Sequence, residues 1–193
     1  MTNYVLIHLV PEGDGARCGH ILNYGQSFKL CAGEPLASSF PQHAAYRMRD
    51  DFPDQVALHE VLYNMDSQLI VHEKARAFLD AERIQRIEYL PVRVLSHKDR
   101  EVAERYFIVN MLPLVDCIDL EKTEHEENLL DPDELMNIRN LTVDENKIPS
   151  DFQLLRLKAV SGAMLIHRDL AAKMKAAGFR GFSTPEVAEY RGN

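Results

Sequence analysis

Residues 69–87 and 164–182 carry the same hydrophobic pattern, at an offset of 95 residues. Each segment reads as a short strand, a histidine, a helix and a second strand. In both helices the apolar residues recur at the i, i+3 and i+4 spacing of one buried face. Identical residues are few, which favours a recurring βαβ-like unit over a true duplication. These two similar strand-helix-strand units predict an α+β fold with a mixed or antiparallel sheet.

A histidine stands between strand and helix in each unit, as His72 and His167. As a functional pair they would be two ligands or two bases, but no acidic residue at a fixed spacing orients them. The first amides of a helix lack partners within the helix, and a polar side chain there can accept from them. We therefore predict that both histidines cap their helices.

Other apolar runs predict the remaining strands, and glycine and proline predict the loops between them. The stretch from 16 to 45 is punctuated by glycines and is expected to hold little regular structure. The predicted strands are 4–10, buried on both faces; 86–95, with Pro91 at an edge or bulge; 106–112; and 152–160, half-exposed because Arg156 and Lys158 alternate with apolar residues.

Two segments have the composition of a helix start. In Asp131-Pro132-Asp133-Glu134 the first aspartate can accept from free amides, and the proline lacks an amide that the first turn cannot use. Ser183-Thr184-Pro185-Glu186 repeats this arrangement and predicts a short C-terminal helix.

A chain of 193 residues supports one ample domain or two small ones. We expect a variable strand and loop region over 1–60 and an α+β domain over 61–193, which could pack as one compact unit. The N-terminus has no basic leader, and its apolar run is too short for a signal peptide or a membrane span. The expected location is the cytoplasm.

Negative charge is concentrated in one segment of the sequence. Residues 116–134 hold nine acidic side chains against one basic side chain, Lys122, and the rest of the chain balances at 21 against 21, which accounts for the net charge of −8. With 46% hydrophobic residues the chain is not expected to be disordered. Without a basic excess it is not expected to bind nucleic acid.

The acidic segment allows three interpretations. Asp116, Asp119 and His125, with Glu124 nearby, could form the site of a metal-dependent hydrolase, although no HExxH or DxDxDG signature supports it. Alternatively Asp116 and Asp119 are structural, bonding to turns or pairing with Arg156 and Lys158. In the third interpretation the exposed acids attract a basic partner, since charge of one sign speeds encounter and selects partners.

No other group of residues predicts catalysis or a cofactor. Cys18, Cys31 and Cys117 form no CxxC pair, match no zinc spacing and are expected to be reduced thiols. Ser38, Ser39 and Ser161 lack a GxSxG context. We therefore expect a protein that is not an enzyme and that needs no metal or cofactor.

Five segments of the sequence form a recognisable succession: YFIVN at 106–110, VDCIDLEKTE at 115–124, DENKIP at 144–149, FQLLRL at 152–157 and AAGFRGF at 176–182. Together they resemble a bacterial immunity-protein family, once classed as a domain of unknown function, which accompanies polymorphic and contact-delivered toxins. The resemblance covers roughly residues 60–182. In that family a serine often opens the two repeat helices, where this chain has His72 and His167, and this favours capping.

The resemblance implies a non-enzymatic inhibitor that binds the effector domain of a cognate toxin and protects the producing cell. If the toxin is a nuclease, its basic substrate groove would suit the acidic segment; for a lipase or peptidase the binding face could lie elsewhere, for example around the N-terminal loops. The oligomeric state is not predicted. The residues expected at the partner-binding surface are Glu124, Glu126 and Glu127, with Asp119 and Glu121.

Overall fold

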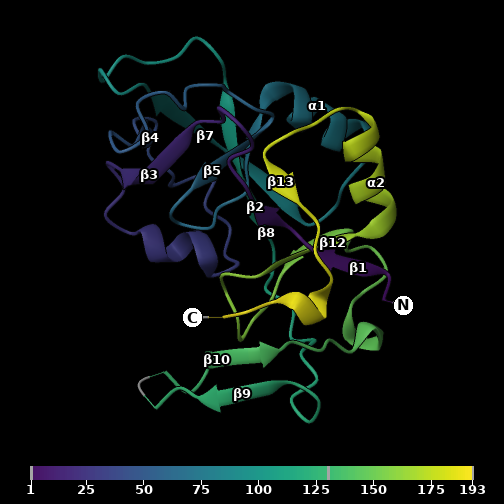
Figure 1. Cartoon of the computed structure of the whole chain (residues 1–193). Coiled ribbons are helices and arrows are strands. Elements are labelled where there is room, and N and C mark those ends of the chain that lie inside the picture. The colour runs from purple at the N-terminus through teal and green to yellow at the C-terminus, as the bar shows by residue number, and fades with distance from the viewer. Residues whose placement is uncertain (1, 130, 193) are drawn as a thin grey trace.

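Short strands make up most of the regular structure in the computed structural model, which describes residues 2–129 and 131–192 (Figure 1). The strands are β1 Tyr4–Leu6, β2 His8–Leu9, β3 Arg17–Leu22, β4 Ala45–Met48, β5 Val61–Asn64, β6 Ile70–His72, β7 Ile87–Leu95, β8 Tyr106–Met111, β9 Glu124–Glu127, β10 Leu135–Asn140, β11 Leu154–Arg156, β12 Met164–His167 and β13 Phe182–Ser183. The helices are α1 Glu73–Ala81 and α2 Arg168–Ala176, with short 3-10 turns at Ser27–Cys31, Glu145–Lys147 and Val187–Glu189. The protein is therefore mostly β, and the expected α+β class describes it only loosely.

Six strands close into a barrel in the order β3-β4-β7-β8-β6-β5. Two of its pairings, β3 with β5 and β4 with β7, are parallel, and the others are antiparallel. β8 lies between β7 and β6, and all six of its residues are buried. Large apolar side chains such as Leu62, Leu90 and Ile108 fill the interior.

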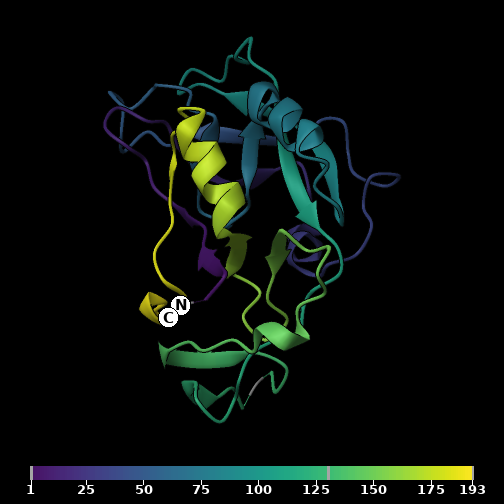
Figure 2. The ribbon, with the colours of Figure 1, turned by 90° about the vertical axis from the view of Figure 1, so that its right-hand side faces the viewer.

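The remaining strands form three small sheets. β12 pairs with β1 and β11, β13 pairs with β2, and β9 pairs with β10 as a separate hairpin. Both views show this hairpin at the opposite end of the molecule from the two helices (Figures 1 and 2).

Both predicted strand-helix-strand units are present. They are β6-α1-β7 and β12-α2-β13, and a histidine precedes each helix. The Nδ1 atom of His72 accepts from the amide of Lys74 at 3.1 Å, and that of His167 accepts from the amide of Asp169 at 3.3 Å. The prediction that these histidines cap the helices is confirmed.

The similarity extends to strands that the sequence pattern did not connect. β8 pairs antiparallel with β6, and β1 pairs antiparallel with β12, so that Tyr106 stands opposite His72 and Tyr4 opposite His167. Each tyrosine meets its histidine edge to face, with ring centroids 5.3 and 5.4 Å apart. Each also donates its hydroxyl hydrogen bond to a backbone carbonyl just before the neighbouring strand, that of His59 at 2.9 Å or Phe152 at 2.5 Å.

The last strand of each unit also occupies an equivalent register. Ile87 pairs with Met111 in the first unit, and Phe182 pairs with Leu9 in the second. We call β5, β6, α1, β7 and β8 the first repeat, and β11, β12, α2 and β13, completed by β1 and β2, the second repeat. The chain is thus a duplicated fold whose second repeat takes its remaining strands from the N-terminus.

The two repeats share one hydrophobic core, to which both helices contribute. Phe78 of α1 and Phe179 after α2 meet edge to face, with ring centroids 5.2 Å apart. Lys173 of α2 pairs with Glu82 at the end of α1, at 2.5 Å. The predicted boundary at residue 60 stays a prediction; strands from both sides of it form the barrel.

Two local predictions, those for 16–45 and for 131–134, are wrong. The stretch 16–45 contains a barrel strand, β3, in addition to loops. Residues 131–134 start no helix: they precede β10, and Asp131 Oδ1 accepts from the amide of Asp133 at 3.2 Å as it would in a turn. The predicted edge position of Pro91 is confirmed, because Pro91 pairs with β8 on one side and the pairing of β7 with β4 begins only at Arg93. The predicted C-terminal helix is present as the 3-10 turn Val187–Glu189.

The predicted half-exposed strand over 152–160 is also wrong. Only Leu154–Arg156 is a strand, and all three residues are buried. The side chain of Arg156 is 2% exposed and donates to the carbonyl oxygens of Ser161 and Ser67 and to the side chain of Gln68. An arginine can alternate with apolar residues on a buried strand when its donors find oxygen acceptors.

Candidate partner-binding site

The predicted partner-binding acids lie on and beside the β9–β10 hairpin. β9 has the sequence Glu-His-Glu-Glu, and its three glutamates, Glu124, Glu126 and Glu127, are exposed. Met136 lies opposite Glu126, and a bulge follows in β10, where Asn137 adopts a left-handed φ of 48°. Because side chains alternate along a strand, Glu124 and Glu126 lie on one face of β9 and Glu127 on the other, and solvent reaches all three.

A polar junction holds the base of the hairpin to the rest of the chain. The buried Thr123 hydroxyl donates to the carbonyl of Thr142 at 3.2 Å and accepts from its amide at 3.1 Å. The amide of Asp119 donates to the same carbonyl at 2.9 Å. These bonds position β9 relative to the buried residues Val115 and Ile118.

The carboxylate of Asp119 is paired with a neighbouring side chain, whereas the side chain of Glu121 is exposed to solvent. Asp119 Oδ2 lies 2.6 Å from Lys122 Nζ, and the hydrogen bond from this ammonium group holds the pKa of the carboxyl below its usual value. The same contact raises the pKa of Lys122. The interpretation of Asp119 as a turn residue fits this geometry, and Lys122 offsets its charge.

The three glutamates of β9 have different surroundings. Glu126 accepts from Asn137 at 2.7 Å and lies 3.7 Å from Arg139 across the hairpin. Glu124 and Glu127 form no ion pair within the described part of the chain. The positive charge of Arg139 therefore offsets part of the negative charge of β9, as Lys122 does for Asp119.

The proposed metal ligands are not gathered into one site. No group of three or more His, Cys, Asp or Glu side chains with metal-binding geometry occurs among residues 2–129 and 131–192. Asp119 pairs with Lys122, His125 Nδ1 lies 2.9 Å from the carbonyl of Thr123, and Asp116 is exposed. The predicted pairing of Asp116 and Asp119 with Arg156 is wrong, since Arg156 contacts only neutral oxygens.

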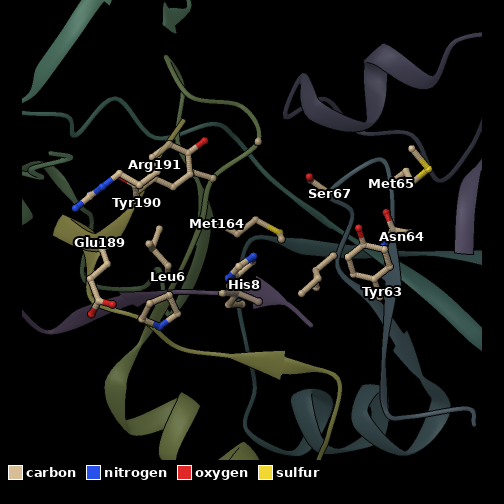
Figure 3. A pocket seen from close by; sticks show the side chains of 15 residues that line it. Leu6, His8, Tyr63, Asn64, Met65, Ser67, Met164, Glu189, Tyr190 and Arg191 are labelled. Carbon is tan, nitrogen blue, oxygen red and sulfur yellow. The ribbon is translucent and has the colours of Figure 1, made fainter. Parts of the chain in front are cut away.

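Sequence reasoning missed a cavity of about 630 Å³ between the two repeats. β1 and β2 form one wall, and the other walls are the loop after β5, the start of β12 and the segment 185–191. Figure 3 shows His8 and Met164 near the middle, between Tyr190 and Arg191 on one side and Ser67 and Met65 on the other. The detectable signal was the likeness of YVLIHLVP at 4–11 to YFIVNMLP at 106–113, which would have identified β1 and β2 as repeat strands.

Fold and surface together define a mostly β protein with two similar repeats around a shared core and an acidic hairpin at one end. The model of the immunity protein family Imm11 matches residues 22–189, and the chain belongs to this family. Membership indicates toxin neutralisation as the general role. No curated protein matches the sequence. Neither α-helix of the described residues has the length and apolar character needed to cross a bilayer.

Proposed function

We propose that this protein neutralises a cognate bacterial toxin by binding its effector domain directly, without catalysis, in the cytoplasm of the producing cell. Membership of an immunity protein family carries the proposal. An inhibitor of this kind requires a stable surface complementary to the toxin, and some inhibitory protein complexes reach dissociation constants of about 10⁻¹³ M or below.

The acidic hairpin is the surface that we assign to this contact. Glu124, Glu126 and Glu127 are exposed on β9, and Glu121 is exposed before it. Asp119 adds a carboxylate that Lys122 partly offsets. A group of like charges attracts an opposite surface over the Debye length, about 8 Å at physiological salt. A toxin with a basic effector domain, such as a nuclease, fits this surface best.

Co-expression tests the proposal. The gene adjacent to that of this protein is expressed with and without it, and growth and co-purification are measured. Growth should be restored and the two proteins should purify together. If the neighbouring protein is toxic and this chain neither restores growth nor binds it, direct neutralisation of that toxin is excluded.

A further inference from the structure

The two repeats differ in what covers one of their strand pairs. In the first repeat Asn110 of β8 lies opposite Glu88 of β7, and residues 34–37 pack against this pair. Asn110 donates to the carbonyl of Glu34 at 2.8 Å, and the Glu88 carboxylate accepts from the amides of Leu36 and Ala37 at 2.5 and 3.2 Å. The side chains of the strand pair thus bind the main chain of the segment.

Leu36 adds an apolar anchor to these polar contacts. Its side chain is buried in the barrel core with Leu90 and Ile108. Residues 34–37 are therefore held by hydrogen bonds to peptide groups and by one inserted apolar side chain. This combination is typical of the recognition of extended peptides.

In the second repeat the equivalent pair is His8 of β2 and Ser183 of β13. Within the described part of the chain no segment covers His8: its side chain is exposed and lines the 630 Å³ cavity. The apolar Leu6 and Met164 line the same cavity (Figure 3). A volume of this size is within the range of about 300–1,000 Å³ common for ligand-binding pockets.

We infer that this cavity receives an extended segment of the toxin, in the position that residues 34–37 occupy in the first repeat. The inference rests on the proposed function and identifies a second part of the contact surface. The imidazole of His8 offers one donor and one acceptor to peptide groups when neutral. Leu6 and Pro185, the equivalents of Ile108 and Leu90 in the second repeat, both line the cavity and offer an apolar contact for one side chain, as Ile108 and Leu90 do for Leu36.

One residue of the cavity wall lies near the hairpin. Tyr190 lines the cavity and packs against the core cluster that contains Ile138 of β10. A single partner could therefore contact the acids of β9 and place a segment in the cavity.

Two glycines provide a matched pair of variants. A Cβ atom at Gly162, in the cavity wall, would meet nothing closer than the Tyr190 hydroxyl at 4.0 Å, and a Cβ atom at Gly25 would meet nothing within 4 Å. Neither glycine requires a left-handed φ. Gly162→Trp should fill the cavity and weaken binding of the purified toxin domain by about 100-fold or more, whereas Gly25→Trp should change the dissociation constant less than about 2-fold. Titration calorimetry measures both.

A second pair of variants tests the inference independently in case Gly162→Trp does not fold. His8→Ala should weaken binding by about 10-fold, and His8→Asn, which installs the first-repeat residue with its amide donor, should stay within about 3-fold of wild type. If wild type binds the toxin but Gly162→Trp binds as tightly as Gly25→Trp, or His8→Ala binds as tightly as His8→Asn, the inference is overturned while the proposed function stands. Absence of binding by wild type would instead overturn the proposed function.

Discussion

Arg156 in the second repeat donates a hydrogen bond from Nη2 to Oε1 of Gln68, just before β6 of the first repeat, at 3.3 Å. The same nitrogen lies 3.2 Å from the carbonyl oxygen of Ser67, and Nη1 donates to that of Ser161. Burial lowers the pKa of the guanidinium group, because no water stabilises its charge. One of the contacts between the repeats thus consists of neutral oxygens arranged around a buried cation.

Arg156→Ala should lower the free energy of unfolding by about 3–5 kcal/mol, since it leaves a cavity and buried oxygens without donors. Urea denaturation measures the change. The control is Arg139→Ala, which removes an exposed arginine and should cost less than about 0.5 kcal/mol. Equal losses in the two variants would mean that the buried hydrogen bonds contribute nothing.

His72→Ala and His167→Ala should each lower the free energy of unfolding by about 1 kcal/mol, because each leaves a first-turn amide without its acceptor. Serine at either position can accept from the same amide, so His72→Ser and His167→Ser should retain most of the stability. Thermal unfolding compares the two series. Serine variants no more stable than the alanine variants would argue against capping.

At pH values below about 6.5 the free energy of unfolding should decrease because of His59. This side chain is 2% exposed, and burial, with a smaller effect of Arg180, lowers its pKa from the usual 6.5. Above pH 6.5 His59 is neutral in the folded and the unfolded protein, so its ionisation does not change the free energy of unfolding. As the pH falls, the unfolded protein binds the proton first, because its histidine has the higher pKa. The free energy of unfolding therefore decreases until the pH reaches the pKa of His59 in the folded protein.

His59→Phe isolates this effect, because Phe152 occupies the equivalent place in the second repeat. The variant keeps the backbone carbonyl that accepts from Tyr106. Urea denaturation between pH 5.5 and 7.5 should show a smaller loss of stability on acidification in the variant than in wild type, by about 1.4 kcal/mol for each unit of pKa shift. Identical pH profiles would exclude His59 as the cause.

Replacing Glu124, Glu126 and Glu127 by lysine should slow association with a basic toxin and reverse its dependence on salt. Stopped-flow mixing at low and physiological salt measures the rate, which we expect to fall by about 10-fold or more at low salt. A control triple variant, Glu34→Lys with Asp54→Lys and Glu104→Lys, changes exposed acids elsewhere by the same charge. If both variants associate at the same rate, the net charge matters and the hairpin does not.

The elements predicted correctly are those in which local pattern and tertiary environment agree. β1 and β8 are buried on both faces, as their apolar runs predict, and α1 and α2 follow capping residues and present one apolar face. The two histidines could be assigned because a free helix amide needs an acceptor wherever the helix packs. The segment 106–124 also carries the sequence motifs on which the family resemblance rests.

The elements that were missed depend on contacts distant in sequence. β3 contains Arg17, Gly19 and His20 and has little intrinsic strand pattern; it becomes a strand by pairing with β4 and β5. Asp131 accepts a hydrogen bond from the backbone amide two residues on, as an aspartate does both in a turn and at a helix start. The local sequence therefore did not distinguish a turn from a helix start. The cavity at His8 exists only because two repeats meet there, and no local pattern encodes it.

The second repeat contains two paired strands that are synthesised far apart in time. β1 pairs with β12, so Tyr4 leaves the ribosome long before its partner His167. At about 5–20 residues per second this interval is on the order of ten seconds, during which a strongly apolar N-terminal strand has no partner from its own repeat. The first repeat is contiguous in the nascent chain and can form during that interval. The part of the shared core that the first repeat supplies, including Val61, Val71 and Val109, is therefore synthesised before β12 can pair with β1.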